Sequence, residues 1–170
     1  MQFNHTISQV LDKSKVQTSR LWHDNWELGY NGAKNVPSAY DALYSFSIIE
    51  TQEGKTLTYR KVYTVGQTLA VQAGRGKKGV ARIRITGLEK RDVRSFTDED
   101  IQREGFTDRL SFFRVWYGMH FPAYVKLLDE GSVTPEWWLD ATKAQIAAHN
   151  TALVIRFELV HDPSMMDIPF

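Results

Sequence analysis

The segment Val65–Leu88 (VGQTLAVQAGRGKKGVARIRITGL) constrains the fold more than any other part of the chain. Apolar and polar residues alternate on both sides of a basic, glycine-rich turn, with Leu69 and Val71 before it and Ile83 and Ile85 after it. Period-two alternation is typical of a strand with one face in a core and the other toward solvent. The segment therefore predicts a β-hairpin whose polar face carries much positive charge.

Charge is distributed unevenly along the chain, although the formal net charge is only +1. Residues 75–94 contain eight Lys and Arg against Glu89 and Asp92, whereas residues 95–170 contain six basic and twelve acidic side chains. Segregation of this kind can create a positive field on a nearly neutral protein. Two interpretations stay open: the cations occupy solvated strand and turn positions, or they bind an anionic partner, with nucleic acid or a nucleotide favoured.

Length and composition set broad limits on the protein class. The 170 residues suffice for one domain with a substantial core. The chain has no cysteine, which excludes disulfides, thiolate metal sites and a cysteine nucleophile. It has no run of about 18 apolar residues, and its N-terminus lacks the regions of a signal peptide, so we expect a cytoplasmic protein that does not bind a membrane.

The other segments predict an α+β protein. Helical spacing of apolar residues occurs over residues 7–13, 106–120, 122–129 and 135–149. Strand patterns occur over residues 15–22, over residues 44–61 as a second hairpin, and over residues 152–160. Thr97 and Asp100 resemble a capping box for a short helix that ends at Gly105. Residues 22–45 show no sustained period and are expected to be irregular.

Three short motifs occur in a characteristic order. Lys15, Thr18 and Arg20 form K-x-x-T-x-R after a strand–helix opening, followed by V-G-Q-x-L-x-V-Q at Val65–Gln72 and x-R-I-R-I-T-G-L at Ala81–Leu88. This order resembles an ASCH domain, a family of the PUA-like superfold. The resemblance implies a small, partly open β-barrel, mixed or antiparallel, with several peripheral helices.

The resemblance covers about residues 1–21, 62–120 and 152–160. We therefore expect residues 1–170 to form a single ASCH or PUA-like domain with insertions at residues 22–61 and 121–151. The family's first motif usually begins with glycine, where this chain has Lys13. A competing copy at Gly54–Arg60 keeps the glycine but falls in a predicted hairpin, so we favour the copy that follows the helix.

The resemblance also implies chemistry. ASCH-like domains are thought to bind RNA or nucleotides beside the barrel, and some relatives are amidohydrolases of modified nucleosides that use the motif lysine and threonine with a glutamate on a later strand. Carried over, Lys15 and Thr18 are the candidate catalytic residues of an amidohydrolase or ribonuclease. The glutamate position falls on Arg84, which stays protonated and cannot act as a general base. Three carboxylates near Lys15 in sequence could take its place: Asp12, Asp24 and Glu27.

We therefore expect RNA or a nucleotide to bind in a cationic cleft beside the barrel. The candidate binding residues are Lys15, Thr18, Arg20, Trp22, Arg75, Lys77, Lys78, Arg82 and Arg84. Trp22 and Trp26 are the expected stacking rings, whereas Trp116, Trp137 and Trp138 are expected to fill or cover the core.

No cofactor or metal is expected, because the five histidines are scattered without a ligand spacing. A third hypothesis is a protein-interaction module that docks a basic partner on the acidic residues 95–149. The sequence leaves the oligomeric state open.

Overall fold

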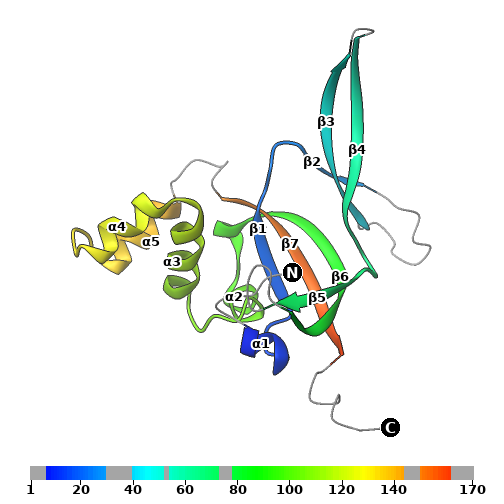
Figure 1. The fold of residues 1–170 in the computed structure, drawn as a ribbon. Helices are drawn as coiled ribbons and strands as arrows, with labels where there is room; N and C mark the ends of the chain where they lie inside the picture. The colour runs from blue at the N-terminus through cyan, green and yellow to red at the C-terminus, as the bar shows by residue number, and fades with distance from the viewer. Residues whose placement is uncertain (1–6, 30–39, 52–53, 73–77, 144–149, 162–170) are drawn as a thin grey trace, which may run out of the picture.

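The computed structural model describes residues 7–29, 40–51, 54–72, 78–143 and 150–161. It is an α+β structure, as predicted, with two antiparallel sheets. The larger sheet curls into half of a barrel (Figure 1). Its order is β1 (Gln17–Leu21), β7 (Thr151–His161), β6 (Gly79–Asp92) and β5 (Thr68–Gln72). The smaller sheet has the order β2 (Trp26–Gly29), β3 (Ala42–Thr51) and β4 (Gly54–Thr64).

The central hairpin is present as β5 paired antiparallel with β6. Ala81, Ile83 and Ile85 are buried while Arg82 and Arg84 are exposed, so the alternation in the sequence corresponds to two real faces. Residues 73–77 of the turn, including the predicted anion contacts Arg75 and Lys77, lie outside the described residues. The final strand, β7, pairs on both sides, with β1 and with β6, and is therefore central in its sheet.

The helices pack on both faces of the curled sheet (Figure 1): the first packs Val10 against Ile83 and Phe157, and the others lie mainly on the opposite face. They are α1 (Ile7–Leu11), α2 (Asp98–Arg103), α3 (Arg109–His120), α4 (Pro122–Asp129) and α5 (Pro135–Lys143), with a 3₁₀ turn at Val93–Ser95. The predicted capping box is confirmed, because Thr97 accepts from the Asp100 amide and Asp100 accepts from the Thr97 amide. Asp108 caps α3.

The predicted tryptophan core is correct at two of three positions. Trp116 and Trp138 are buried in the cluster between the helices and the sheet. Trp137 is 56% exposed, so it does not fill the core, and of its two predicted roles only that of covering the core stays a prediction. Successive helical residues point about 100° apart, and α5 turns Trp138 rather than its neighbour toward α3, where it meets the Tyr117 ring at 5.7 Å.

The strand register divides the curled sheet into two faces. We call the face of Ala152 and Val154 the helix face, because these residues pack against the helices. The face of Leu153 and Ile155 is the hairpin face, because these residues pack against Leu43 and its neighbours at the root of β2–β4. In β1 the side chains alternate in the same way, because Ser19 pairs with Val154 whereas Thr18 pairs with Ile155 and Arg20 with Leu153.

The second predicted hairpin is confirmed as β3–β4 and is longer than the sequence pattern indicated. Residues 22–45 were expected to be irregular, and this is wrong for Trp26–Gly29, which form β2 and pair with β3. Beyond the end of β2, Phe46–Thr51 and Gly54–Tyr59 form a two-stranded arm that projects from the body (Figure 1). Within the part of the chain that the structure describes, no helix has both the length and the apolar character needed to cross a membrane.

Candidate functional site

Lys15 and Glu104 form a buried ion pair between β1 and α2. The Lys15 ammonium lies 3.2 Å from Glu104 Oε2, and the two side chains are 3% and 4% exposed. Lys15 also donates to the backbone carbonyl of Glu104. Ser19 Oγ donates to Glu104 Oε1 at 2.5 Å, and Gln17 Nε2 donates to the same oxygen at 3.3 Å. One carboxylate therefore gathers three side chains from the β1 segment.

The end of α2 places this carboxylate. Glu104 follows the last helical turn, and Gly105 has φ = +84°, a conformation that favours glycine and ends the helix. The Val16 amide donates to the Arg103 carbonyl at 3.1 Å, which fixes α2 against β1. Burial lowers the pKa of Lys15, and the charge of Glu104 opposes that change.

The rest of the K-x-x-T-x-R motif faces the other way. Thr18 and Arg20 lie on the hairpin face, where Arg20 Nη1 donates to Thr18 Oγ1 at 3.0 Å and to the Ser19 carbonyl at 3.0 Å. Lys15 is instead bound to Glu104 at the helix side of the strand. The structure thus separates the predicted catalytic pair, because successive side chains of a strand point to opposite faces.

A group of cations and aromatic rings lies near the end of β1 on the hairpin face. Lys90 Nζ lies 4.4 Å from the centroid of the Trp22 ring. Trp22 meets Trp26 edge to face at 6.0 Å, and His23 meets Trp26 at 4.4 Å. In the register, Lys90 and Arg20 both pair with Leu153 and so flank it on one face. Half-buried rings with adjacent cations are suited to stacking on bases and to binding phosphate.

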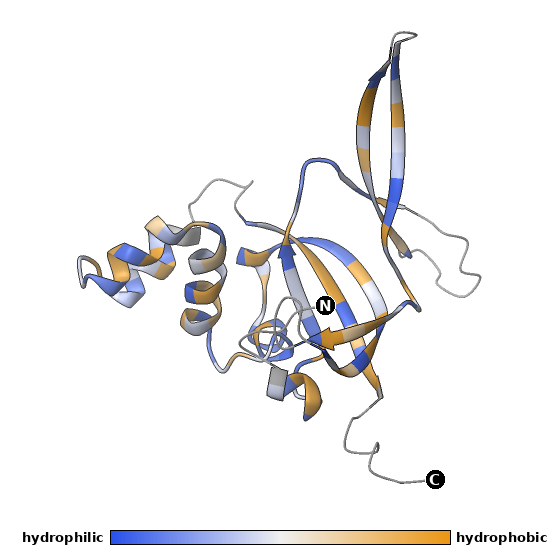
Figure 2. Ribbon diagram, viewed as in Figure 1, coloured by the Kyte–Doolittle hydropathy of each residue, from blue (hydrophilic) through white to orange (hydrophobic). Residues whose placement is uncertain are grey.

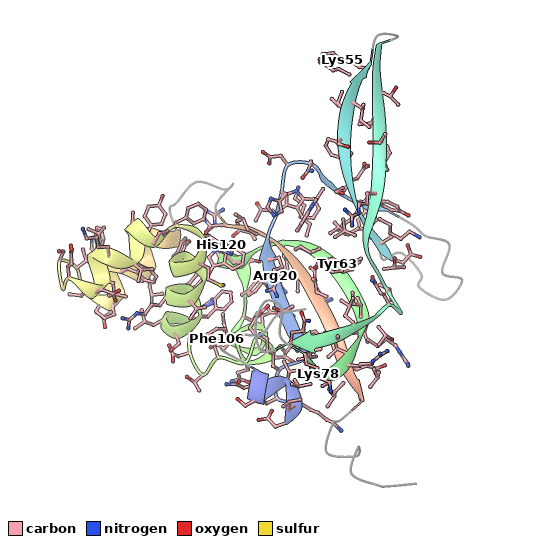
Figure 3. All side chains as sticks on the ribbon, in the orientation of Figure 1. Arg20, Lys55, Tyr63, Lys78, Phe106 and His120 are labelled. Carbon is pink, nitrogen blue, oxygen red and sulfur yellow. The ribbon has the colours of Figure 1, made fainter. Side chains whose placement is uncertain are left out.

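His120, at the end of α3 on the helix side, comes within range of the charges of this group at the edge strand β1. Partial burial lowers its pKa, and the positive charges of Arg20 and His23 lower it further. Its ring also meets Trp116 at 4.7 Å. Figure 3 labels Arg20 and His120 on their two elements. We use the name aromatic–cation surface for this group, whose members are Arg20, Trp22, His23, Trp26, Lys90 and His120.

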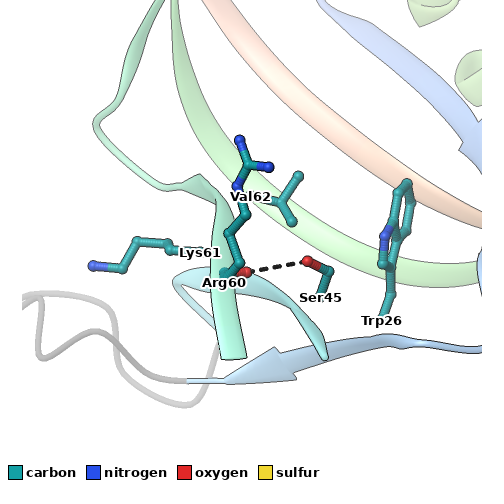
Figure 4. A pocket seen from close by; sticks show the side chains of 5 residues that line it. All are labelled: Trp26, Ser45, Arg60, Lys61 and Val62. Atoms are coloured by element: carbon teal, nitrogen blue, oxygen red, sulfur yellow. Dashed lines mark hydrogen bonds between the residues drawn. The ribbon is translucent and has the colours of Figure 1, made fainter. Parts of the chain in front are cut away.

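A pocket of about 280 Å³ lies beside this surface at the root of the arm. Trp26, Ser45, Arg60 and Val62 line it together with Lys61, and Figure 4 shows Trp26 and Arg60 on opposite sides of Ser45. Ser45 Oγ donates to the Arg60 carbonyl at 3.4 Å. The pocket therefore offers a tryptophan ring and a guanidinium close together, at about the lower size limit of ligand pockets.

The predicted cations of β6 lie on the opposite side of the sheet from Arg20. Arg84 pairs with Glu158 across the strands and lies 3.3 Å from its carboxylate. Arg82 shares the face of Arg84, two residues along the strand, and Lys78 is exposed before β6 begins. The two groups expected to form the walls of one cleft therefore lie on different faces.

Carboxylates accompany several other arginines of the helix face. Arg156 contacts Glu89 at 2.6 Å, and Arg91 contacts Asp100 at 2.7 Å. The competing motif copy lies in β4, where Lys55 pairs with Glu50 and is 71% exposed. Only the first copy has its lysine inside the fold.

Sequence reasoning missed three residues of these sites. Glu104 was part of a helix signal and lies 89 positions from Lys15, so no local pattern joined them. Lys90 lies on β6 beyond Leu88, but a β-bulge between Ile85 and Gly87 interrupts the alternation, so the sequence pattern alone would have placed Lys90 on the face of Arg82 and Arg84. His120 is one of five scattered histidines, and no ligand spacing in the sequence marks it. Among the described residues, no group of three or more His, Cys, Asp or Glu could hold a metal ion.

Comparisons with known proteins give one distant structural likeness. No family model matches the chain, and no curated protein matches it. Its fold is similar to the crystal structure of protein EF3133 from Enterococcus faecalis V583, described with the family name DUF984. The two chains are 14% identical, with 91% of this chain and 69% of that chain covered and a TM-score of 0.45. This likeness is too distant to carry a functional argument, and the ASCH resemblance stays a prediction.

Proposed function

We propose that this protein binds RNA or a nucleotide through the aromatic–cation surface. The single observation that supports this most is the Lys90 ammonium 4.4 Å from the Trp22 ring, beside Trp26. A base can stack on an indole ring, and adjacent cations bind its phosphate. Lys90 is exposed and Trp22 is half-buried, so both are accessible from solvent.

The charges around His120 support the same surface. Arg20 and His23 are close enough to lower its pKa, so three groups that can carry positive charge converge there. Such convergence is unfavourable without an anion and favourable with one. The finer assignment, an ASCH domain on a PUA-like barrel, is part of this proposal, since a curled half-barrel with helices beside it is consistent with that fold.

A fluorescence titration tests the proposal. Short single-stranded RNA should quench tryptophan emission, and affinity should fall steeply between low and moderate salt, because phosphate contacts release counterions. Lys90→Ala should weaken binding and reduce the salt slope by about 1. Lys126→Ala on α4 is a matched control, since this lysine is 72% exposed and lies in an i,i+4 pair with Glu130. Equal affinities for the wild type and Lys90→Ala would refute the proposed surface.

A second candidate function is hydrolysis of a modified nucleoside, using Lys15. A specific observation favours it, because the enzyme hypothesis required a carboxylate within hydrogen-bond reach of Lys15 and Glu104 lies 3.2 Å away. Gln17 Oε1, buried beside the pair, is the one buried side-chain polar atom in the described residues without a hydrogen-bond partner. A donor from a substrate could satisfy it.

This candidate has its own test. The protein would be incubated with a panel of N-acylated nucleosides, and the free carboxylic acid would be measured. Hydrolysis that disappears in Lys15→Ala and in Glu104→Gln, both checked for folding by circular dichroism, would support it. If the wild type hydrolysed none of these nucleosides, the hydrolase function would be refuted. Thr18→Ala distinguishes the two nearby hydroxyls. Loss of hydrolysis in this variant would support the threonine that the family resemblance implies, whereas unchanged hydrolysis would favour Ser19, whose hydroxyl contacts Glu104.

A further inference from the structure

The β3–β4 arm has one mainly apolar and one mainly polar face, although Ile49 lies on the second. The register pairs Phe46 with Tyr59 and Ile48 with Leu57, so these four side chains share a face, which we call the apolar face of the arm. Ile48 is 62% exposed, Leu57 49% and Tyr59 56%. On the opposite face, Ser47 and Thr58 share a hydrogen bond of 2.8 Å. Figure 2 shows hydrophobic and hydrophilic residues interleaved along both strands of the arm.

Exposed apolar side chains are unusual on a projecting two-stranded arm. Two strands alone are marginally stable in water, and apolar patches rimmed by polar residues usually mark an interface. At the root of the arm, Ser45 pairs with Trp26, which packs toward the curled sheet. Ser45 and Ser47 lie on the face opposite to Phe46 and Ile48, so the apolar face is directed away from the body of the protein.

We propose that the apolar face of the arm packs against the same face of a second copy of this chain. The two arms would pack face to face and point in the same direction, related by a two-fold axis that runs between them parallel to their length. This operation places β3 of one copy opposite β4 of the other. Ile48 then meets the partner's Leu57 and Phe46 meets the partner's Tyr59, so every apolar residue of the face has an apolar partner. A self-complementary contact of this kind is the commonest form of homodimer interface.

Charge at the tip agrees with this arrangement. Glu50 pairs with Lys55 in the register and lies on the same face as Ile48. The two carry opposite charge, 2.9 Å apart. With parallel arms, Glu50 of each copy comes opposite the partner's Lys55, which gives two further attractive contacts. With antiparallel arms, Lys55 would instead come opposite the partner's Lys61, a repulsive contact.

The size of the face sets the strength of the dimer. A standard interface buries about 800 Å² on each partner, and four side chains per copy bury much less. We therefore expect a dissociation constant of the dimer in the micromolar range or higher. The inference uses residues other than those of the aromatic–cation surface, and it can fail or hold independently of RNA binding.

Sedimentation velocity of the full chain, from low micromolar to submillimolar concentration, is the first experiment. The wild type should shift from monomer to dimer as concentration rises. Ile48→Asp should stay monomeric, because it places a charge in the apolar face. Ile49→Asp is the matched control on the opposite face of the same strand, where Ile49 is also 49% exposed, and it should dimerise like the wild type. A monomeric wild type, or equal effects of the two substitutions, would overturn the proposal.

Mixing two charge variants tests the arrangement itself. Glu50→Lys gives an arm tip with two lysines, and Lys55→Glu gives a tip with two glutamates. Each alone should dimerise at least several-fold more weakly than the wild type, whereas a mixture of the two should form a heterodimer. Neither substitution touches the core of the body. If Lys55→Glu alone strengthened the dimer, or the mixture showed no heterodimer, the parallel arrangement would be wrong.

Discussion

The two faces of β1 hold similar cations in different ways. On the helix face, Lys15 is enclosed by a carboxylate from α2, and the pair is almost fully buried. On the hairpin face, Arg20 lies near the rings and cations of the aromatic–cation surface. The difference comes from the element that packs on each face: α2 ends in a glutamate, whereas the chain after β1 supplies tryptophans and a histidine. The role of a cation in this fold is therefore decided by its packing partner more than by its own position in a motif.

The largest expected effect is on the helix face. Glu104→Ala leaves the Lys15 ammonium buried without its counter-charge, which should lower the free energy of unfolding by about 3–5 kcal/mol. Urea denaturation measures it. Glu99→Ala is the control, because its ion pair with Arg103 is exposed and contributes about 0.5 kcal/mol or less.

A double variant sharpens this prediction. Lys15→Met/Glu104→Leu removes both charges and should recover much of the loss, since a buried ion pair can often be replaced by apolar residues. If Glu104→Ala were no more destabilising than Glu99→Ala, the buried pair would not hold α2 against β1.

A smaller effect is expected at Asp100, also on the helix side. Hydrogen bonds from the Arg91 guanidinium, at 2.9 and 2.7 Å, hold the pKa of Asp100 well below its usual range. The folded carboxylate releases its proton more readily than the unfolded one. Its stabilisation is therefore complete above the unfolded pKa of about 3.9 and is lost as pH falls below it.

Asp100→Asn should lower the free energy of unfolding by about 2 kcal/mol at pH 7, because it removes a charged pair and weakens a helix cap. It should also flatten the acid limb of a plot of stability against pH. Asp98→Asn, on the same helix at an exposed site, should leave that limb unchanged. A wild-type stability that does not fall between about pH 5 and pH 2 would contradict the linkage.

Local patterns in the sequence predicted much of the fold and little of the site. The alternation around Leu69 and Ile83 and the capping box at Thr97 depend on neighbouring residues, and the structure confirms them. The partner of Lys15 could not be read in this way, because 89 positions separate it from Glu104 and only the packing of α2 on β1 joins them. The division of Thr18 and Ser19 between two faces also depends on a strand whose sequence signal was weak.

Two substitutions on β6 compare the faces in RNA binding. Lys90 and Arg82 lie on the same strand and are both exposed, but Lys90 contacts Trp22 whereas Arg82 lies on the other face. Lys90→Glu should weaken single-stranded RNA binding by about tenfold, and Arg82→Glu by much less, since loss of a phosphate contact and a cation–ring contact together exceed a general charge effect. Fluorescence titrations at one salt concentration measure both. If Arg82→Glu weakened binding more than Lys90→Glu, RNA would lie on the helix face, which carries Arg82 and Arg84, two of the binding residues predicted from the sequence.

The smallest expected effect is a dependence of RNA affinity on pH. Partial burial and the charges of Arg20 and His23 lower the pKa of His120, so in the free protein its protonation below about pH 6.5 favours the unfolded state. A phosphate bound beside these groups would stabilise the charged imidazole and raise that pKa. Binding would then take up a proton, and affinity should rise a few-fold as pH falls from about 7.5 to 6. His120→Gln should remove this rise, while His161→Gln, at the far end of β7, should keep it. An affinity that is independent of pH in the wild type would mean that phosphate does not reach His120, and would confine the binding surface to Trp22, Trp26 and Lys90.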